Sequence, residues 1–571
     1  MEAGKRAIND IFNGNKVLEI PFFQRAYVWE KAQWERFLAD MESVSTTNKA
    51  YFLGSVILKQ QMTPSQQSVG DRRTVIDGQQ RLTTLNIFFK VLSLKTQNSY
   101  LDNLFRLPMQ NNEIALLHNH NDVSAFNRIL NLSEEEILTG EDNVTQAYQY
   151  FSENIDVSKL NFQNILTNIM FVGVDLGIQD DEQQIFDTIN SLGVKLTTAE
   201  LLKNYFFSRN DIQLYKDYWQ NVFERDAENK DYWDTEIIAG RNRRVFIDLF
   251  FFAFLQIKVQ DSTLSVKTED KIEFSKLEVL FESYKKFIEV YLGGDKLGLM
   301  AEIRNYAKVF EVAFDTEYTD SELPATSGIE RINAIIFGLE TTTLIPYVLY
   351  VLNNVQDETE RNAIFDYLES YVMRRMVCHA NTKNYNQIFT DRLIANKILT
   401  REAFKSYIDE RSDETNYMPT DGELKEGFHA SKLVNKQSAG ILYFIESRIR
   451  NRSLHSTSLL GLSKYSLEHI MPKKWENHWG KLNNPDARNS RNRQLLTLGN
   501  LTIIPASLNS AIRDGAWDLK RSGRGHNKGL THYAAGLDTF SQYLQEPIWD
   551  EEKIGERADF LFEQAKDAWK N

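Results

Sequence analysis

The stretch from Thr74 to Leu85, TVIDGQQRLTTL, joins a strand pattern directly to a helix pattern. Val75 and Ile76 are β-branched and predict the end of a buried strand, and apolar residues follow at helical spacing from Leu82 onward. Gly78 predicts a turn between the two, because glycine adopts backbone angles that are closed to other residues. The chain is therefore expected to contain a layer in which a strand leads straight into the N-terminus of a helix.

Two interpretations of this junction remain open on the sequence. A helix N-terminus offers free N–H groups and the positive end of the helix dipole, which together attract anions. Arg81, one turn into the helix, could bind a phosphate with its forked guanidinium. The alternative is a capped helix in which Arg81 pairs with a structural carboxylate, and the stretch by itself favours neither interpretation.

The chain has 571 residues, which is enough for about two to four domains with cores of their own. It contains one cysteine, Cys378, which excludes a disulfide framework or a thiolate zinc site within one chain and favours a reducing cytoplasm. The first residues, MEAGKRAINDIFNG, lack the apolar core of a signal peptide. The longest apolar stretch, from Ala334, is interrupted by Glu340 and Pro346, so we expect a buried helix pair and no membrane span.

Changes in pattern divide the chain into three predicted domains, residues 1–210, 211–450 and 451–571. The first mixes strands, expected in YFLGSVILKQ, RTVI and NIMFVGVDL, with helices such as KAQWERFLADMESV. DEQQIFDTINSLGVKLTTAELLKNYFF predicts two short helices around a turn at Gly193. The second domain is almost wholly helical, and the polar segment SDETNYMPTDGELKEG before the third predicts a loop or linker.

Charge is distributed unevenly along the chain. The net charge is −13, yet residues 451–533 contain 13 lysines and arginines against 5 aspartates and glutamates, together with five of the nine histidines. Electrostatic attraction depends on where charges lie and not on the total. The sequence therefore predicts a polyanion-binding C-terminal module and argues against a protein that coats nucleic acid over its whole surface.

Two C-terminal segments contain the residues best suited to chemistry, SLEHIMPKKW and LLTLGNLTIIPASLNSAIRDGAWDLKR. Residues 467–471 predict a short strand that the following proline ends. Residues 495–498 predict a second strand that turns at the Gly-Asn pair, residues 501–504 continue extended, and a helix is expected beyond them. The result is a predicted β-turn-β-helix unit.

Such a unit suits metal-assisted phosphodiester hydrolysis. His469, on the first strand, can take a proton from water while it is neutral. Oxygen atoms of Glu468, on the same strand, and of Asn509, on the helix, can bind one hard cation, Mg²⁺ or Mn²⁺, and Asn500 can brace the turn. Basic residues nearby are candidates for binding backbone phosphates: Lys473, Lys474, Arg488, Arg491, Arg493, Arg513, Lys520, Arg521 and Arg524. The plainer alternative is a surface Glu-His pair beside an ordinary hairpin turn.

These segments resemble the His-Me finger (HNH-type) nuclease domain, a ββα-metal fold, at the C-terminus of GmrSD-type (type IV) restriction enzymes. The family pattern is Glu/Asp-His-Ile-x-Pro, then Gly-Asn-Leu-Thr, then an Asn on a helix with a Lys beyond. EHIMP, GNLT and the two residues Asn509 and Lys520 match it. The resemblance implies that His469 is the general base, that Glu468 and Asn509 lie at the metal, and that Asn500 orders the loop.

The first 210 residues resemble the same family's N-terminal domain through IPFFQRAYVWE, FLGSVIL, VIDGQQRLTTL and FDTINSLGVKLTTAELLKN. Ala26 departs from the pattern, which has Pro there. The resemblance implies a ParB/sulfiredoxin-like α/β domain that binds or hydrolyses a nucleoside triphosphate (GTP, UTP or ATP). The nucleotide-binding residues that it implies are Asp77, Gly78, Gln79, Gln80 and Arg81, with Gln24 and Arg25, and on weaker grounds Asn190 and Gly193. There is no Walker A sequence, so a P-loop enzyme is not expected.

Four aromatic residues of the first motif, Phe22, Phe23, Tyr27 and Trp29, are candidates for a wall that senses a modified nucleotide. Ordinary core packing is the alternative for at least half of them.

The resemblance implies an α+β multidomain, NTP-regulated, modification-dependent endonuclease that nicks or cuts double-stranded DNA in anti-phage defence. Two marks stay open: modified cytosines, as for GmrSD, and backbone phosphorothioates, as for the similar SspE proteins; BrxU proteins are similar as well. The expected partners are modified double-stranded DNA and an NTP, with a homodimer as a further possibility and no membrane. An NTP-dependent DNA-binding regulator and an RNase are the alternatives from other classes.

Overall fold

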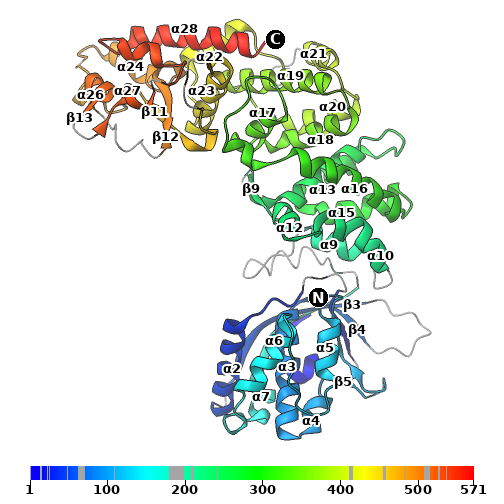
Figure 1. Ribbon diagram of the computed structural model, residues 1–571. Coiled ribbons are helices and arrows are strands. Elements are labelled where there is room, and N and C mark those ends of the chain that lie inside the picture. The colour runs from blue at the N-terminus through cyan, green and yellow to red at the C-terminus, as the bar shows by residue number, and fades with distance from the viewer. Residues whose placement is uncertain are drawn as a thin grey trace. The chain divides into compact units, whose positions relative to one another are not determined.

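The computed structural model describes residues 2–571 apart from 13–15, 22–23, 25, 48, 62–70, 109, 179, 181–197, 208–210, 241, 411–415, 454, 456–457, 481, 507–514, 525–526 and 535. The chain forms two compact units, Met1–Asp217 and Tyr218–Asn571, and each is described by itself (Figure 1). Within the described residues, no helix is both long and apolar enough to cross a membrane.

A six-stranded mixed sheet lies at the centre of the first unit, in the order β1-β8-β3-β4-β2-β7. β1 and β3 each pair with β8, antiparallel and parallel respectively, β3 and β4 are antiparallel, and β2 runs parallel to β4 and β7. The strands are β1 Glu2–Ala7, β2 Val17–Glu19, β3 Tyr51–Gln60, β4 Arg72–Asp77, β7 Leu116–Leu117 and β8 Ile169–Leu176, with a separate pair β5 Arg106–Leu107 and β6 Glu113–Ile114. The three predicted strands are confirmed as β3, β4 and β8; β1 was not predicted.

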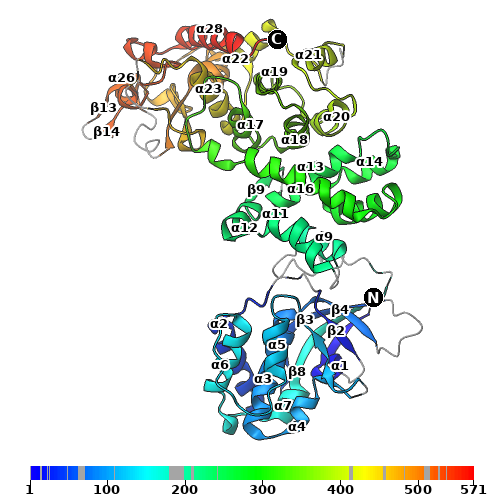
Figure 2. The same cartoon turned by 45° about the vertical axis from the view of Figure 1, so that its right-hand side comes forward.

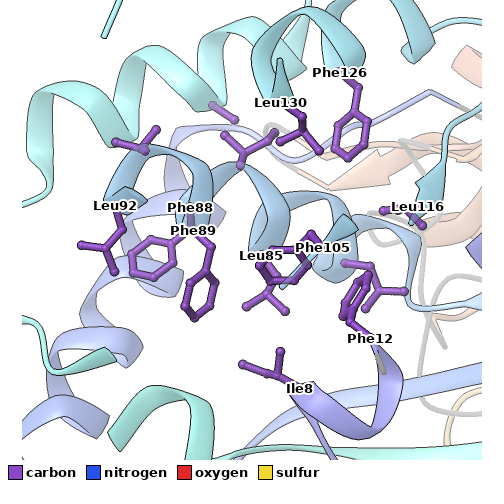
Figure 3. Packing of buried hydrophobic residues seen from close by; sticks show 14 of the residues in the cluster. Ile8, Phe12, Leu85, Phe88, Phe89, Leu92, Phe105, Leu116, Phe126 and Leu130 are labelled. Atoms are coloured by element: carbon purple, nitrogen blue, oxygen red, sulfur yellow. The ribbon is translucent and has the colours of Figure 1, made fainter. Parts of the chain in front are cut away.

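Helices of the first unit gather beside this sheet and enclose its core (Figure 2). α3 is buried along most of its length because apolar residues occupy every side of it. Leu85, Phe88 and Phe89 of α3 pack among residues of several elements (Figure 3), and the Phe89 ring lies 5.4 Å from that of Phe105. The helices are α1 Ile8–Ile11, α2 Lys31–Thr46, α3 Gln79–Thr96, α4 Ser99–Asn103, α5 Val123–Leu130, α6 Asn143–Asn154, α7 Phe162–Asn168, α9 Thr198–Phe206 and α10 Ile212–Tyr215. The helix expected at KAQWERFLADMESV is confirmed as α2, whereas Gly193 and its predicted turn lie outside the described residues.

The junction between β4 and α3 has the predicted form. Gly78 stands at the N-cap of α3 with φ of 103°, a left-handed conformation that favours glycine. A Cβ at this position would lie 2.9 Å from Cγ2 of Val56 and 3.1 Å from the carbonyl oxygen of Ser55. Backbone conformation and close packing on β3 therefore both require glycine at this turn.

The second unit is mainly helical, with a short hairpin near its start and small sheets near its end. The hairpin pairs β9 Glu236–Ala239 with β10 Asn242–Val245. The helices before the C-terminal part are α11 Asn221–Phe223, α12 Ala227–Trp233, α13 Phe246–Lys258, α14 Thr268–Phe274, α15 Leu280–Lys286, α16 Lys296–Ala313, α17 Ile329–Asn333, α18 Ile345–Asn354, α19 Glu358–Val377, α20 Leu393–Ala395, α21 Arg401–Asp409, α22 Asp421–Ala430 and α23 Asn435–Ile449. α22 occupies part of the segment predicted as a linker, which corrects that prediction: the Thr420–Glu423 capping box begins a helix there.

The C-terminal part pairs β11 Tyr465–His469 with β12 Leu501–Pro505 in an antiparallel sheet. It also contains α24 Pro485–Gln494, α26 Trp517–Ser522, β13 Gly523–Arg524, β14 Asn527–Lys528, α27 Leu530–Tyr533 and α28 Glu551–Ala568. Residues 495–498 are not the predicted strand: α24 ends just before them and a 3-10 turn, Leu498–Asn500, follows. Their apolar side chains are buried at a helix end, which gives the same pattern as a short strand. α28 packs against α22, α24 and the 3-10 turn (Figure 1).

Candidate functional site

The predicted catalytic pair lies on the β11–β12 sheet of the second unit. Glu468 pairs in register with Thr502, and His469, the last residue of β11, pairs with Leu501. The prediction that Glu468 and His469 stand on a strand is confirmed. Asn509 lies outside the described residues, so its place beside this pair stays a prediction.

Lys520 of α26 contacts both residues of the pair. Its ammonium forms an ion pair with the Glu468 carboxylate and donates a hydrogen bond to the backbone carbonyl of His469 (2.5 Å). The side chains of Lys520 and Glu468 are 1% and 11% exposed. This burial does not fit the interpretation of Lys520 as a surface residue for DNA phosphates, and we correct it to a buried partner of Glu468.

The oxygen atoms of Glu468 and His469 that contact Lys520 are also the candidate ligands of a divalent cation. A carboxylate oxygen of Glu468 and the carbonyl oxygen of His469 converge on one positive charge, the Lys520 ammonium, and Mg²⁺ and Mn²⁺ prefer oxygen ligands of this kind. Among the described residues, no three His, Cys, Asp or Glu side chains form a metal-binding group. The donors present are of the type that a hard cation prefers, but both are bonded to Lys520, so a metal site at Glu468 with Asn509 stays a prediction.

The His469 ring is neutral at pH 7. Burial, followed by the positive charges of Lys473 and Lys520, lowers the pKa of His469 to about 4. A buried imidazole loses hydration in its charged form, and nearby cations disfavour that form further. A neutral ring nitrogen can accept a proton, which is what a general base requires.

Asn500 is fully buried and ties β12 to the residues that follow His469. Its side-chain oxygen accepts the N–H of Met471 (2.9 Å), and its amide nitrogen donates to the carbonyls of Met471 (2.9 Å) and Leu495 (3.0 Å). Its backbone carbonyl accepts the N–H of Ile470 (2.9 Å). These bonds are the side-chain to backbone contacts expected of a residue that orders the loop.

The predicted DNA-binding residues differ in exposure. Arg491 is buried, donates to both oxygens of Glu551 (2.6 and 3.0 Å), and its guanidinium lies 4.6 Å from the ring of Trp475. Its assignment to DNA is therefore corrected to a structural role that joins α24 to α28. Arg513 lies outside the described residues. Lys473, Lys474, Arg488 and Arg493 are exposed, Arg521 is half-buried, and the side chain of Arg524 lies outside the described part of the chain.

At the end of β4 in the first unit, Arg81 pairs with Asp77. Arg81 donates through Nη2 to Asp77 (3.0 Å) and to the carbonyl of Ser55 (2.7 Å), and the Ser55 hydroxyl donates to Asp77 (2.5 Å). The guanidinium lies over Gly54, where a Cβ would come within 3.0 Å of Nε. That Nε has no hydrogen-bond partner among the described residues. The structural carboxylate of the plainer interpretation is thus present, and the phosphate role stays a prediction.

Other predicted nucleotide residues lie around the N-terminus of α3. Gln80 accepts the backbone N–H of Val28 (2.9 Å), so it links the helix to the segment AYVW. Gln24 is buried and accepts a hydrogen bond from Asn204 (3.1 Å), and Gln79 is buried in the first turn of α3. Arg25, Asn190 and Gly193 lie outside the described residues.

Tyr27 belongs to the core, which corrects its assignment to a sensing surface. Its ring is 3% exposed, its hydroxyl is hydrogen-bonded to Thr84 (2.6 Å), and the Trp34 indole donates to that hydroxyl (2.8 Å). Trp29 is partly buried against the same core. Phe22 and Phe23 lie outside the described residues.

A buried polar cluster lies beside Tyr27 and was not predicted from the sequence. One carboxylate oxygen of Asp122 accepts the backbone N–H of Tyr27 (2.7 Å) and the side-chain amide of Asn119 (3.0 Å). His118 lies 3.6 Å from the same oxygen and is hydrogen-bonded to Thr83 (2.8 Å). The five residues HNHND carry no apolar signal and are typical of an exposed loop, so the pattern gave no sign of burial.

Both the N-terminal and the C-terminal part of the chain match models of known protein families. Residues 8–207 match the model of the GmrSD restriction endonuclease N-terminal domain, and residues 418–564 match that of the GmrSD restriction endonuclease C-terminal domain. Among proteins with curated descriptions, no sequence matches this chain. The first match contains the β4–α3 junction, and the second contains β11, the 3-10 turn and most of α28. Together the matches cover more than half of the chain, which belongs to the GmrSD restriction endonuclease family.

Proposed function

We propose that the protein is an NTP-regulated, modification-dependent DNA endonuclease of restriction defence, with a ParB/sulfiredoxin-like N-terminal domain and an HNH-type C-terminal domain. One observation carries the nuclease assignment. His469, neutral at pH 7, ends a strand beside a buried carboxylate, and the loop beyond it is held by Asn500. A base, an oxygen ligand and a fixed loop are the parts that metal-assisted hydrolysis needs.

In this proposal His469 takes the proton from the attacking water, and burial keeps its ring available for that proton. Glu468, with Asn509, would hold one Mg²⁺ or Mn²⁺, and a bound cation would stabilise negative charge on the leaving oxygen. Lys473, Lys474 and Arg493 are exposed near this strand in sequence and would hold backbone phosphates. The proposed substrate is double-stranded DNA; RNA is the alternative, and cleavage of a matched RNA tests it.

For the N-terminal domain we propose a nucleotide site at the β4–α3 junction. The glycine turn leaves the first N–H groups of α3 at the end of the sheet, and the Nε donor of Arg81 has no partner among the described residues. Backbone N–H groups at a helix N-terminus and a guanidinium are suited to a triphosphate. GTP, UTP and ATP are the candidates, and Asp77 would orient water or a cation.

A plasmid-nicking assay tests the nuclease assignment. Wild type, His469→Ala and His478→Ala are compared with Mg²⁺ or Mn²⁺; His478 is an exposed histidine of the same region and serves as the control. Loss of the base should lower the rate by about 100-fold or more, whereas the control should keep it. Unchanged cleavage by His469→Ala rejects the site, and faster cleavage of a matched RNA favours the RNase alternative.

A substrate panel tests the modification. Unmodified, glucosylated-cytosine and phosphorothioated duplexes are cleaved with and without each NTP. Preference for one mark in the presence of one NTP supports the proposal and identifies the mark. Equal cleavage of all three duplexes removes modification dependence from the function.

NTP turnover tests the first unit separately. Arg81→Ala should abolish most hydrolysis because the substitution removes a phosphate donor, and Arg128→Ala, an exposed arginine on α5, should retain it. Full turnover by Arg81→Ala contradicts the phosphate role.

A further inference from the structure

Arg557 is a fully buried arginine in the middle of α28. Its Nη1 lies within hydrogen-bond distance of three carbonyls, those of Leu498 (3.2 Å), Gly499 (2.9 Å) and Leu501 (2.6 Å). Its Nε donates to the carbonyl of Thr539 (3.2 Å). Within the described part of the chain no carboxylate lies at ion-pair distance from Arg557, and the negative charge of Glu446 acts on it from farther away.

These three carbonyls flank Asn500 on both sides. Gly499 allows the helix to approach, because a Cβ there would lie 2.3 Å from the backbone carbonyl of Ile554 in α28. Trp549, just before α28, donates its indole N–H to the side-chain oxygen of Asn500 (3.0 Å). The conformation of the 3-10 turn is therefore fixed from the side of α28 by a guanidinium, an indole and close backbone packing.

The 3-10 turn also fixes the position of the end of β11. Asn500 binds the backbone of Ile470 and Met471, the two residues after His469. Arg557 therefore bonds the carbonyls on either side of Asn500, and Asn500 in turn bonds the two residues that follow the proposed base. Burying a guanidinium without an anionic partner in direct contact is costly, and an apolar side chain could fill the same space at lower cost. A purely space-filling role does not account for the charge.

We propose that Arg557 is a positioning residue of the nuclease site: it holds the carbonyls around Asn500 and so sets the position of His469. The inference rests on the proposed function of His469. It predicts that loss of the guanidinium slows cleavage without weakening DNA binding, since Arg557 is buried and cannot contact DNA itself.

The experiment uses the full-length protein and compares Arg557→Met, Arg557→Lys and Arg375→Met. Arg375 is an equally buried arginine of α19 that donates to the carbonyls of Tyr417 (2.8 Å) and Asn381 (2.6 Å), away from the site residues. Initial cleavage rates are measured under multiple-turnover conditions over a range of DNA concentrations, and folding by circular dichroism and Tm. Misplacement of a catalytic group by about 1 Å costs roughly 100-fold in rate.

We expect Arg557→Met to lower kcat by roughly 10- to 100-fold with KM for DNA little changed, Arg557→Lys to recover part of the loss, and Arg375→Met to lower Tm while it keeps kcat. Wild-type kcat in folded Arg557→Met, or equal losses of kcat in both methionine variants, would overturn the inference. If Arg557→Met does not fold, Arg557→Lys decides, because it keeps the buried cation and removes the forked guanidinium; wild-type kcat there also overturns the inference. An active His469→Ala variant would instead reject the proposed function.

Discussion

Lys520 and Glu468 form a buried ion pair between α26 and β11, although 52 residues separate them in the chain. The same ammonium donates to the backbone carbonyl of His469, so one side chain fixes both members of the Glu-His motif. The same ion pair therefore stabilises the C-terminal sheet and holds the residues of the proposed site in place.

We expect Lys520→Met to destabilise the C-terminal part strongly. Removing one partner of a buried ion pair takes the Lys520 charge away from the Glu468 carboxylate, which costs about 3–5 kcal/mol. Adding Glu468→Gln to Lys520→Met should restore part of the loss, because no charge is then left uncompensated. Urea unfolding of both single variants and the double variant gives the coupling energy; Lys464→Met, at an exposed pair with Asp320, is the control. Strictly additive effects would contradict a buried pair.

Asn500→Ala should unfold more easily than wild type by about 2–4 kcal/mol, because it removes three side-chain hydrogen bonds to a buried loop. The Trp549 indole N–H also loses its acceptor. Asn477→Ala, at an exposed position, should change the free energy of unfolding by less than about 0.5 kcal/mol. Equal stability of the two variants in urea would show that the loop is held by other contacts.

A strand or helix can be predicted from the sequence when a local pattern defines it, and it is missed when partners far away in the chain define it. β3 and α2 were predicted because alternation and helical spacing are local properties. β1 was missed because its sequence, EAGKRA, is mostly exposed and pairs with β8, more than 160 residues away. The motifs located Glu468, His469 and Asn500 correctly on β11 and in the turn beside it.

The sequence could not show which basic residues are buried and which are exposed, because this too depends on partners far away in the chain. Lys520 and Arg491 lie among exposed cations, and nothing local distinguishes them from Lys473 or Lys474. Their burial follows from acidic partners 52 and 60 residues distant, so it became evident only in the folded chain. Residues 495–498 were assigned to a strand because a short apolar run fits a strand and a helix end equally well.

Gly78→Ala should destabilise the first unit by more than about 1 kcal/mol. An L-residue at φ of 103° is strained, and the added Cβ would meet Val56 at 2.9 Å. Gly240→Ala is the matched control, since Gly240 also has positive φ (65°) but nothing lies within 4 Å of its Cβ position. Thermal unfolding followed by circular dichroism measures both, and an equal Tm for the two variants would exclude the steric contribution.

Cys378 should resist alkylation in the native protein. Burial, followed by the negative charge of Glu423, raises the pKa of its thiol to about 12. The thiolate fraction at pH 8 is then on the order of 10⁻⁴, and the thiolate is the reactive form. Mass spectrometry after iodoacetamide treatment should show modification in denaturant and little without it. Rapid native alkylation at pH 8 would contradict the raised pKa.

Substitutions at Asp122 distinguish two contributions to stability: the hydrogen bonds that its carboxylate accepts and the negative charge that it buries. Burial raises the pKa of Asp122, the hydrogen bonds from Tyr27 and Asn119 oppose the shift, and Asp142 and His120 add smaller effects of opposite sign. Because the pKa is higher in the folded state, the favourable contribution of the protonated group is present at low pH. It is lost as pH rises through the raised pKa, so the ionised carboxylate is a cost at pH 7.

Asp122→Asn keeps a side-chain oxygen to accept from Tyr27 and Asn119 and removes the buried charge, so its stability at pH 7 should equal or slightly exceed that of wild type. Asp122→Ala removes the acceptor and should cost about 1–3 kcal/mol. Urea unfolding over a series of pH values from 7 downward measures both, and any advantage of Asp122→Asn should shrink as the wild-type carboxyl becomes protonated. If Asp122→Asn is as unstable as Asp122→Ala at pH 7, the negative charge itself stabilises the segment that carries Tyr27, and His118, 3.6 Å away, is then the group to examine as its partner.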